Sequence, residues 1–169
     1  RALIDWPLTP YTGWGGYGIQ LAQALLEQGL YSPRLLAKND RTQHCDLHWL
    51  DALQYLENVS KSLVEAMAEA SSVGNLPVPT KASIGFSPLG NQVPPPRFIA
   101  DRHVGVTFFE CSRFSEQDLQ VLKKFDLVVS GSRWNQAFLK QQGVNQARLV
   151  HQGVDTAVFN PEPVPRLIN

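Results

Sequence analysis

Glycine is concentrated near the N-terminus, in a spacing that suits the binding of an anion. The segment Gly13-Trp14-Gly15-Gly16-Tyr17-Gly18 matches the pattern G-x-G-x-x-G. Backbone without Cβ atoms can approach a phosphate closely, and a following helix offers free N–H groups and the positive end of its dipole. A phosphate or a sugar hydroxyl could therefore dock at this segment. The alternative is a plain loop whose glycines adopt positive φ angles.

The same letters occur in dinucleotide-binding proteins, and Asp40 lies about twenty residues further on, where an acid would contact a ribose. That fingerprint requires a tight turn directly after the first strand. Here Pro7 and Pro10 separate the first apolar run from the first glycine. Half of a dinucleotide-dependent oxidoreductase, with a nicotinamide or flavin, is therefore kept only as an alternative.

Aromatic and acidic side chains supply further candidates for sugar chemistry. Trp14 and Tyr17 could stack on a sugar ring of an acceptor, or could equally pin the glycine segment to the core. Glu110 follows a strand-like apolar run, so its carboxylate could accept hydrogen bonds from sugar hydroxyls or take a proton from an acceptor. The alternative for Glu110 is an ion pair with Arg113.

Two serines are candidates for acceptor binding. Ser132 precedes a helical pattern and is first of all a helix cap, with ligand binding as its second interpretation. Ser87 follows the strand-like segment that ends at Phe86 and has the same two interpretations.

The histidines and cysteines do not form a metal-binding pattern. His44 and His48 flank Cys45, but no third ligand accompanies them, so we expect no metal. His103 could bind an acidic acceptor together with neighbouring arginines, although a loose basic surface is the simpler interpretation. We expect His151 to be buried or hydrogen-bonded to backbone rather than catalytic.

These residues need strands and helices to position them. After a first strand at 2–5 and a turn-rich stretch, the apolar spacing predicts a helix over 17–28, which Gly29 ends. Further strands are expected at 35–37, 82–86, 104–109, 127–129 and 148–151, and further helices at 46–70, 115–125 and 132–142. This alternation predicts an α/β fold, a three-layer Rossmann-like domain with a mostly parallel sheet. Ligands of such sheets bind at the carboxyl ends of the strands.

Composition narrows the class of protein. The chain has 169 residues, a formal net charge of zero and 43% apolar residues. These values argue against a disordered chain and against a dedicated nucleic-acid binder. No apolar run approaches the about 18 residues of a membrane span, so we expect at most peripheral membrane contact. Only two cysteines are present, which fits a reducing, cytoplasmic compartment.

Several segments together resemble the N-terminal domain of GT-B-fold glycosyltransferases, specifically the retaining family 4 (group 1). The first is Gly15-Gly16 followed by Leu21-Ala22-x-x-Leu25. The second is the run from Asp126 through Val128-Val129 and Ser132 to Trp134. The third and most specific is Val150-His151-Gln152-Gly153-Val154-Asp155-x-x-x-Phe159-x-Pro161. Thr107-Phe108-Phe109-Glu110 is similar to a strand end found in one subgroup of the family.

The resemblance implies transfer of a sugar from a nucleotide-sugar donor to an acceptor, which could be a glycan, a lipid or a small molecule. It implies that no metal is required and that backbone at Gly15 and Gly16 lies near the diphosphate or sugar of the donor. Residues 1–155 would form the acceptor-side domain, and residues 156–169 would begin a linker to a C-terminal donor-binding domain. Such a domain alone is expected to be inactive, and a non-catalytic sugar-binding module of the same fold is the alternative.

Overall fold

The computed structural model describes residues 1–39, 47–109 and 112–153, and for residues 47–49 it describes the backbone alone. In chain order the elements are β1 (Ala2–Ile4), α1 (Gly13–Gln28), β2 (Pro33–Leu35), α2 (Leu47–Ser72), β3 (Val78–Ala82), β4 (Ile84–Leu89), β5 (Phe98–Ala100), β6 (His103–Thr107), α3 (Glu116–Leu122), β7 (Leu127–Ser130), α4 (Arg133–Gln141) and β8 (Ala147–Leu149).

Six strands form one parallel sheet in the order β2-β1-β4-β6-β7-β8, and β3 pairs with β5 in a separate two-stranded sheet. The chain moves outward from β1 to β2 and then returns to the other side of β1 at β4. The strand order therefore reverses between β1 and β4, and open α/β sheets bind their ligands outside the carboxyl ends of the strands at such a point. The α/β fold with a parallel sheet, predicted from the alternation of elements, is confirmed.

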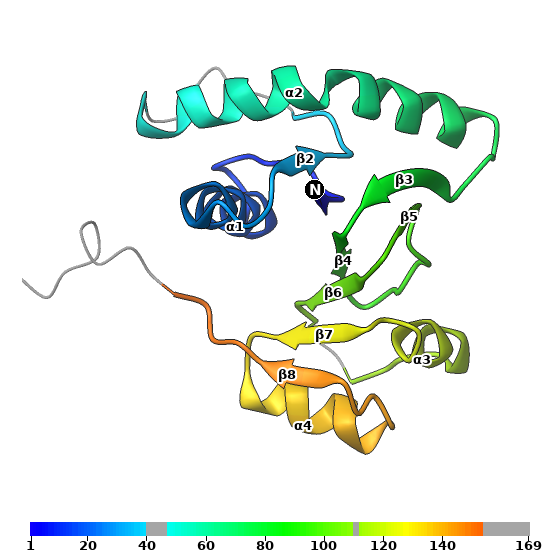
Figure 1. Cartoon of the computed structure of the whole chain (residues 1–169). Helices are drawn as coiled ribbons and strands as arrows, with labels where there is room; N and C mark the ends of the chain where they lie inside the picture. Colours follow the sequence, from blue (N-terminus) through cyan, green and yellow to red (C-terminus); the bar gives the residue numbers. More distant parts are fainter. Residues whose placement is uncertain (40–46, 110–111, 154–169) are drawn as a thin grey trace, which may run out of the picture.

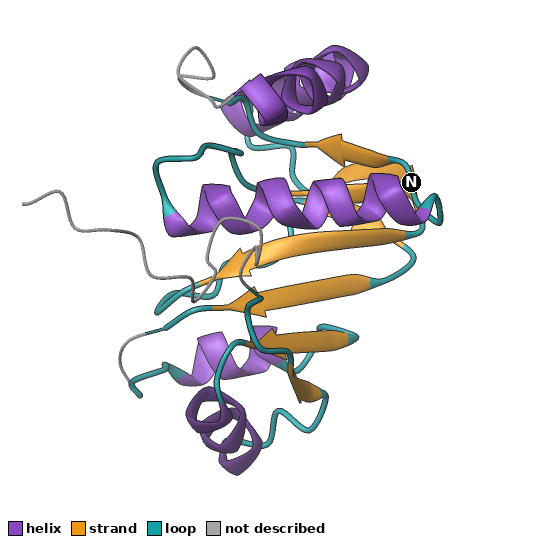
Figure 2. Cartoon of the chain, turned by 90° about the vertical axis from the view of Figure 1, so that its left-hand side faces the viewer, coloured by secondary structure: helices purple, strands orange, loops and turns teal. Residues whose placement is uncertain are grey.

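Helices cover both faces of the sheet and its edges. In Figure 1, α1 and α3 lie on opposite sides of the sheet, with α2 beyond β2 and α4 beside β8. Figure 2 shows α1 in front of the sheet, running roughly along the strands, on the face turned to the viewer. Ile4 and Val106 pack with Ile19 and Ala22 under α1, whereas Val128 packs with Leu122 and Leu139 under α3 and α4. Three layers result, as the sequence predicts.

The largest difference from the sequence prediction is the start of α1. The prediction excluded helix from residues 7–16, but α1 begins at Gly13, because the Thr12 side chain caps it by accepting the Gly15 N–H at 3.0 Å. Each glycine weakens a helix by about 1 kcal/mol relative to alanine. Packing accounts for two of them: a Cβ atom at Gly15 would overlap Thr9, and one at Gly18 would overlap Leu8 and Trp6.

The stretch from residue 73 to residue 103 also carries more structure than a connection with one strand. It contains β3, β4 and β5, and β5 lies against the face of the main sheet. There the Phe98 ring occupies the space left open by the missing side chain of Gly85. The remaining predicted boundaries differ from the structure by a few residues, and Gly29 and Gly143 end their helices with positive φ angles of 65° and 83°.

Within the described ranges, no helix combines the length and the apolar character that crossing a bilayer requires. The predicted linker at 156–169 lies outside the described residues, as does the end of the predicted domain from Val154. The boundary at residue 155 therefore stays a prediction.

Candidate functional site

A hollow of about 600 Å³ lies at the N-terminal end of α1, beside the segment that follows β8. Its walls come from two parts of the chain that are far apart in sequence. They are Gly13, Gly16, Tyr17, Gln20 and Leu21 from α1, and His151, Gln152 and Gly153 from the segment after β8. The glycine segment and the start of the most specific motif of the sequence therefore share one surface depression.

Two neighbouring glycines of the candidate site have different surroundings. Gly16 lines the hollow, and a Cβ atom placed on it would meet no described atom within 4 Å outside its own helix. Gly15 is buried, and the backbone of Thr9 fills the space where its side chain would be. Gly16 thus leaves room for a ligand, whereas Gly15 is required by the packing of the loop before α1. The predicted contact of either glycine with a donor phosphate stays a prediction.

The backbone donors at this helix end are partly used. The Gly15 N–H donates to the Thr12 side chain at 3.0 Å, and the Gly16 N–H donates to the Thr12 carbonyl at 2.9 Å. Among the described residues, the N–H groups of Gly13 and Trp14 have no hydrogen-bond partner. The free donors lie two residues earlier than the predicted pair, at the positive end of a helix of 16 residues.

Trp14 and Tyr17 belong to an aromatic cluster. The Phe108 ring lies edge-on to both, with centroid distances of 4.7 Å to Trp14 and 5.5 Å to Tyr17. Trp6 joins them and donates its Nε1–H to the Trp14 carbonyl at 2.9 Å. The cluster pins the start of α1 to the core, which was the alternative interpretation of these residues. Only Tyr17 also lines the hollow, and burial raises the pKa of its phenol.

Neither of the two candidate serines lines the hollow. Ser132 caps α4, and its hydroxyl accepts the Asn135 N–H at 3.1 Å. Ser87 is buried in β4 and lines a separate, smaller cavity together with Asp5 and Arg97. The predicted role of Ser132 as a helix cap is confirmed, whereas acceptor binding by either serine stays a prediction.

Glu110, the tentative catalytic residue, lies outside the described residues, as do Asp40, His44, Cys45 and Cys111. The side chain of His48 is not described either. In the part of the chain that the structure does describe, no group of three histidines, cysteines or carboxylates is placed to hold a metal ion.

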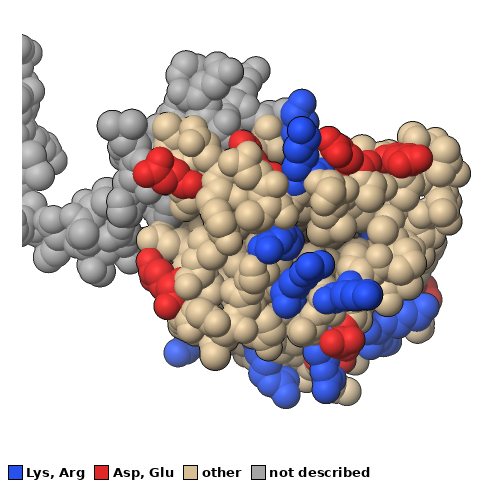
Figure 3. Space-filling model, turned by 45° about the horizontal axis from the view of Figure 1, so that its top comes forward, with Lys and Arg blue, Asp and Glu red and all other residues tan. Residues whose placement is uncertain are grey.

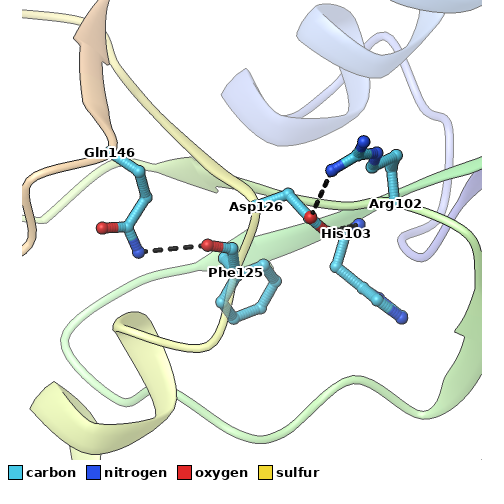
Figure 4. Close-up of polar contacts among 5 residues, drawn as sticks. All are labelled: Arg102, His103, Phe125, Asp126 and Gln146. Carbon is cyan, nitrogen blue, oxygen red and sulfur yellow. Dashed lines mark hydrogen bonds and ion pairs between the residues drawn. The ribbon is translucent and has the colours of Figure 1, made fainter.

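The basic residues near His103 are engaged in ion pairs. Arg102 binds Asp126 at 3.0 Å, and the backbone N–H of His103 donates to the same carboxylate at 2.8 Å, as Figure 4 shows. Gln146 donates to the Phe125 carbonyl at 3.1 Å in the same view. These contacts join the amino ends of β6 and β7, and burial lowers the pKa of His103. Figure 3 shows several Lys and Arg side chains together on one face, with single Asp and Glu side chains among and around them.

Sequence reasoning missed three side chains of the hollow, which are Gln20, His151 and Gln152. His151 was expected to be buried or hydrogen-bonded to backbone; it is exposed, so the first of these two interpretations is wrong. Its place in the motif that begins at Val150 was the available signal. Together these groups offer amide and imidazole hydrogen bonds beside the free backbone N–H group of Gly13, which suits a polar, anionic ligand. No protein-family model, curated protein or solved structure matches this chain.

Proposed function

We propose that this chain is the acceptor-side domain of a retaining GT-B glycosyltransferase. The enzyme would move a sugar from a nucleotide-sugar to a glycan, lipid or small-molecule acceptor. The observation that carries the proposal is the hollow at the start of α1, which Gly16 and His151 both line and in which Gly16 leaves open space. The sequence motifs that resemble this family begin at these two places in the chain.

The physical basis is the match between this end of α1 and a glycosyl diphosphate. Two unpaired N–H groups and the helix dipole favour a negatively charged group, and the absence of a side chain at Gly16 lets it approach. A hollow of about 600 Å³ falls within the range of about 300–1,000 Å³ that is usual for ligand pockets. The donor enters as a substrate, and a second, nucleotide-binding domain would hold its other end.

Two alternatives are distinguished by different observations. A non-catalytic sugar-binding module would show the same hollow but no transfer. The oxidoreductase half requires a tight turn between the first strand and the first helix. Residues 5–12 separate β1 from α1, and this long connection argues against a dinucleotide site. A metal-independent reaction is a part of the proposal that follows from the family resemblance alone. A cytoplasmic location is proposed from the small number of cysteines.

The test uses the product of the complete native gene and a panel of nucleotide-sugars. Release of the nucleoside diphosphate and the mass of the product report transfer. Gly16→Val places a branched side chain in the hollow, and we expect transfer to fall about 100-fold or more because the reacting groups are displaced. Ala24→Val is the control, since Ala24 is an exposed residue further along α1.

A thermal melt of each variant separates lost folding from lost chemistry. Full transfer activity of a folded Gly16→Val protein would show that the hollow does not bind the donor. Absence of transfer with every donor in the panel, while sugar binding persists, would favour the non-catalytic module.

A further inference from the structure

A second cavity, of about 240 Å³, lies where the strand order reverses. The register of β1 and β4 pairs Ile4 with Phe86, so the next residues, Asp5 and Ser87, lie side by side on one face of the sheet. Arg97, which precedes β5, reaches the same place. Proline rings form the rest of the wall, contributed by Pro88, Pro94 and Pro95. The cavity shares no lining residue with the hollow at α1.

The two charges in this cavity balance each other. Arg97 binds the Asp5 carboxylate through both of its oxygens, with Nη2 to Oδ1 at 2.5 Å and Nε to Oδ2 at 3.2 Å. Asp5 is 7% exposed. No hydrogen bond among the described residues uses Nη1 of Arg97. The pair therefore offers a ligand both accepting lone pairs and donating N–H groups without a net charge.

Ser87 adds a polar group that the protein leaves unused. The residue is 4% exposed, and its Oγ is buried without a hydrogen-bond partner among the described residues. Buried hydroxyls in native proteins nearly always have a partner, because burying an unpaired one is unfavourable. An unpaired hydroxyl in the wall of a cavity is therefore explained if a bound molecule supplies the partner.

We propose that Asp5, Ser87 and Arg97 form a binding site for one end of an uncharged, hydroxyl-rich molecule such as a sugar or a cyclitol. A hydroxyl group can donate to the Asp5 carboxylate and accept from Arg97, and a neighbouring hydroxyl can pair with Ser87. The flat proline walls suit the apolar faces of a sugar ring. In the proposed glycosyltransferase this molecule would be the acceptor. Only that statement rests on the proposed function, and the binding site itself does not.

An anion is a poorer fit for this cavity. The Asp5 carboxylate already neutralises Arg97, and a second negative charge beside Asp5 would be repelled. The volume also suits one ring or one terminal unit, since it lies below the about 300 Å³ at which drug-sized ligand pockets begin. An acceptor with a longer chain would place only its end here.

The experiment is a titration of the chain described here, followed by two-dimensional ¹⁵N–¹H NMR. The uncharged probes are D-glucose and myo-inositol, and the anionic probe is inorganic phosphate. We expect the sugar or the cyclitol to shift the resonances of Gly85, Ser87 and the Arg97 side chain in a saturable way. Phosphate should leave these resonances unchanged. No nucleotide-sugar is present, so the result does not depend on transfer.

Two serine variants separate binding from folding. Ser87→Ala removes a hydroxyl without a protein partner, so it should leave the melting temperature unchanged or raise it while binding weakens about tenfold. Ser130→Ala is the matched control, because Ser130 is also buried at a strand end but lies 3.5 Å from the Thr107 hydroxyl. It should lower the melting temperature and leave binding unchanged.

Three results would overturn the assignment: no saturable shift with either uncharged probe, tighter binding of phosphate than of these probes, or wild-type binding by Ser87→Ala. A chain that binds the uncharged probe while the native gene product transfers no sugar would retain the site and remove the glycosyltransferase. Transfer by the native gene product, without binding of the probes in this cavity, would support the glycosyltransferase and remove the site.

Discussion

Asp5 and Arg97 lie 92 positions apart in the sequence and meet through two hydrogen bonds at the carboxyl end of β1. The contact ties the segment before β5 to the centre of the main sheet. It also places a buried charge pair where the strand order reverses, beside a cavity and an unpaired hydroxyl.

The first prediction concerns the loss of Arg97. Arg97→Met keeps most of the side-chain volume but leaves the Asp5 carboxylate buried and unpaired. Removing one partner of a fully buried pair costs about 3–5 kcal/mol. The Arg97 side chain is 39% exposed, so solvent screening reduces this cost. We expect Arg97→Met to lower the free energy of unfolding at neutral pH by about 2 kcal/mol, measured by chemical denaturation.

The pH dependence of this loss has a defined sign. Burial raises the pKa of Asp5, and Arg97 opposes that shift. A raised carboxyl pKa means that the folded state binds the proton more tightly, so the stability contributed by this group is present below the unfolded pKa and is lost as the pH rises through the folded pKa. Arg97→Met removes the attraction that opposes this shift and raises the folded pKa of Asp5 further. The stability deficit of the variant should therefore be smallest in acid and grow as the pH rises through the folded pKa of Asp5. A deficit independent of pH would contradict this account.

The second prediction contrasts the neighbouring glycines. Gly16→Ala adds a methyl group in open space and improves helix propensity, so it should stabilise the fold by about 0.5–1 kcal/mol. Gly15→Ala forces a methyl group against the Thr9 backbone and should destabilise it by about 1–3 kcal/mol. Thermal melts of the two variants measure the difference. Equal effects would mean that the two glycines do not have the distinct surroundings described above.

The third prediction concerns the start of α3. The Asp118 carboxylate accepts the Val93 N–H at 2.9 Å and the Ser115 N–H at 3.0 Å, and the hydrogen bonds from Ser115 and Val93 lower the pKa of this carboxyl. The resulting stability is present above the unfolded pKa and is lost as the pH falls through the folded pKa. Asp118→Ala should therefore cost about 1 kcal/mol at pH 7 and much less near pH 2.

Glu116→Gln is the control for that measurement, because Glu116 lies in the same turn but contacts Gln120 on the exposed side. It should have a small effect at both pH values. A deficit of Asp118→Ala that persists at low pH would assign the effect to packing rather than to the carboxylate.

The fourth prediction tests whether Ser132 binds a ligand. If its hydroxyl serves only to cap α4, Ser132→Ala should cost about 1 kcal/mol in stability and leave sugar transfer by the native gene product unchanged. Ser132→Asp keeps a capping oxygen and should restore most of the stability. A loss of transfer in a variant of normal stability would instead return Ser132 to the acceptor site.

Local signals in the sequence were sufficient for much of the fold. The alternation of apolar strand and helix patterns predicted a parallel sheet between helices. Ser132 before α4 and Gly29 after α1 marked helix ends correctly, because caps depend on residues within one turn. The predicted start of α1 was too late, because the low helix propensity of glycine was considered alone. The sequence did not show that Gly15 packs against Thr9 and that Gly18 packs against Trp6.

The candidate sites depended on the sequence to different degrees. The residue types at Gly16 and Tyr17, and the motif that begins at Val150, determined where chemistry was to be sought. Only the tertiary structure decided that His151 and Gly16 line the same hollow, that Trp14 belongs to the aromatic cluster, and that Asp5 is paired with Arg97 beside Ser87. Hydrophobic periodicity indicates which face of a helix or strand is buried, but it does not indicate which distant segment covers that face. Contacts between distant segments are set by how the strands are ordered in the sheet, and that order arises only when the whole core packs.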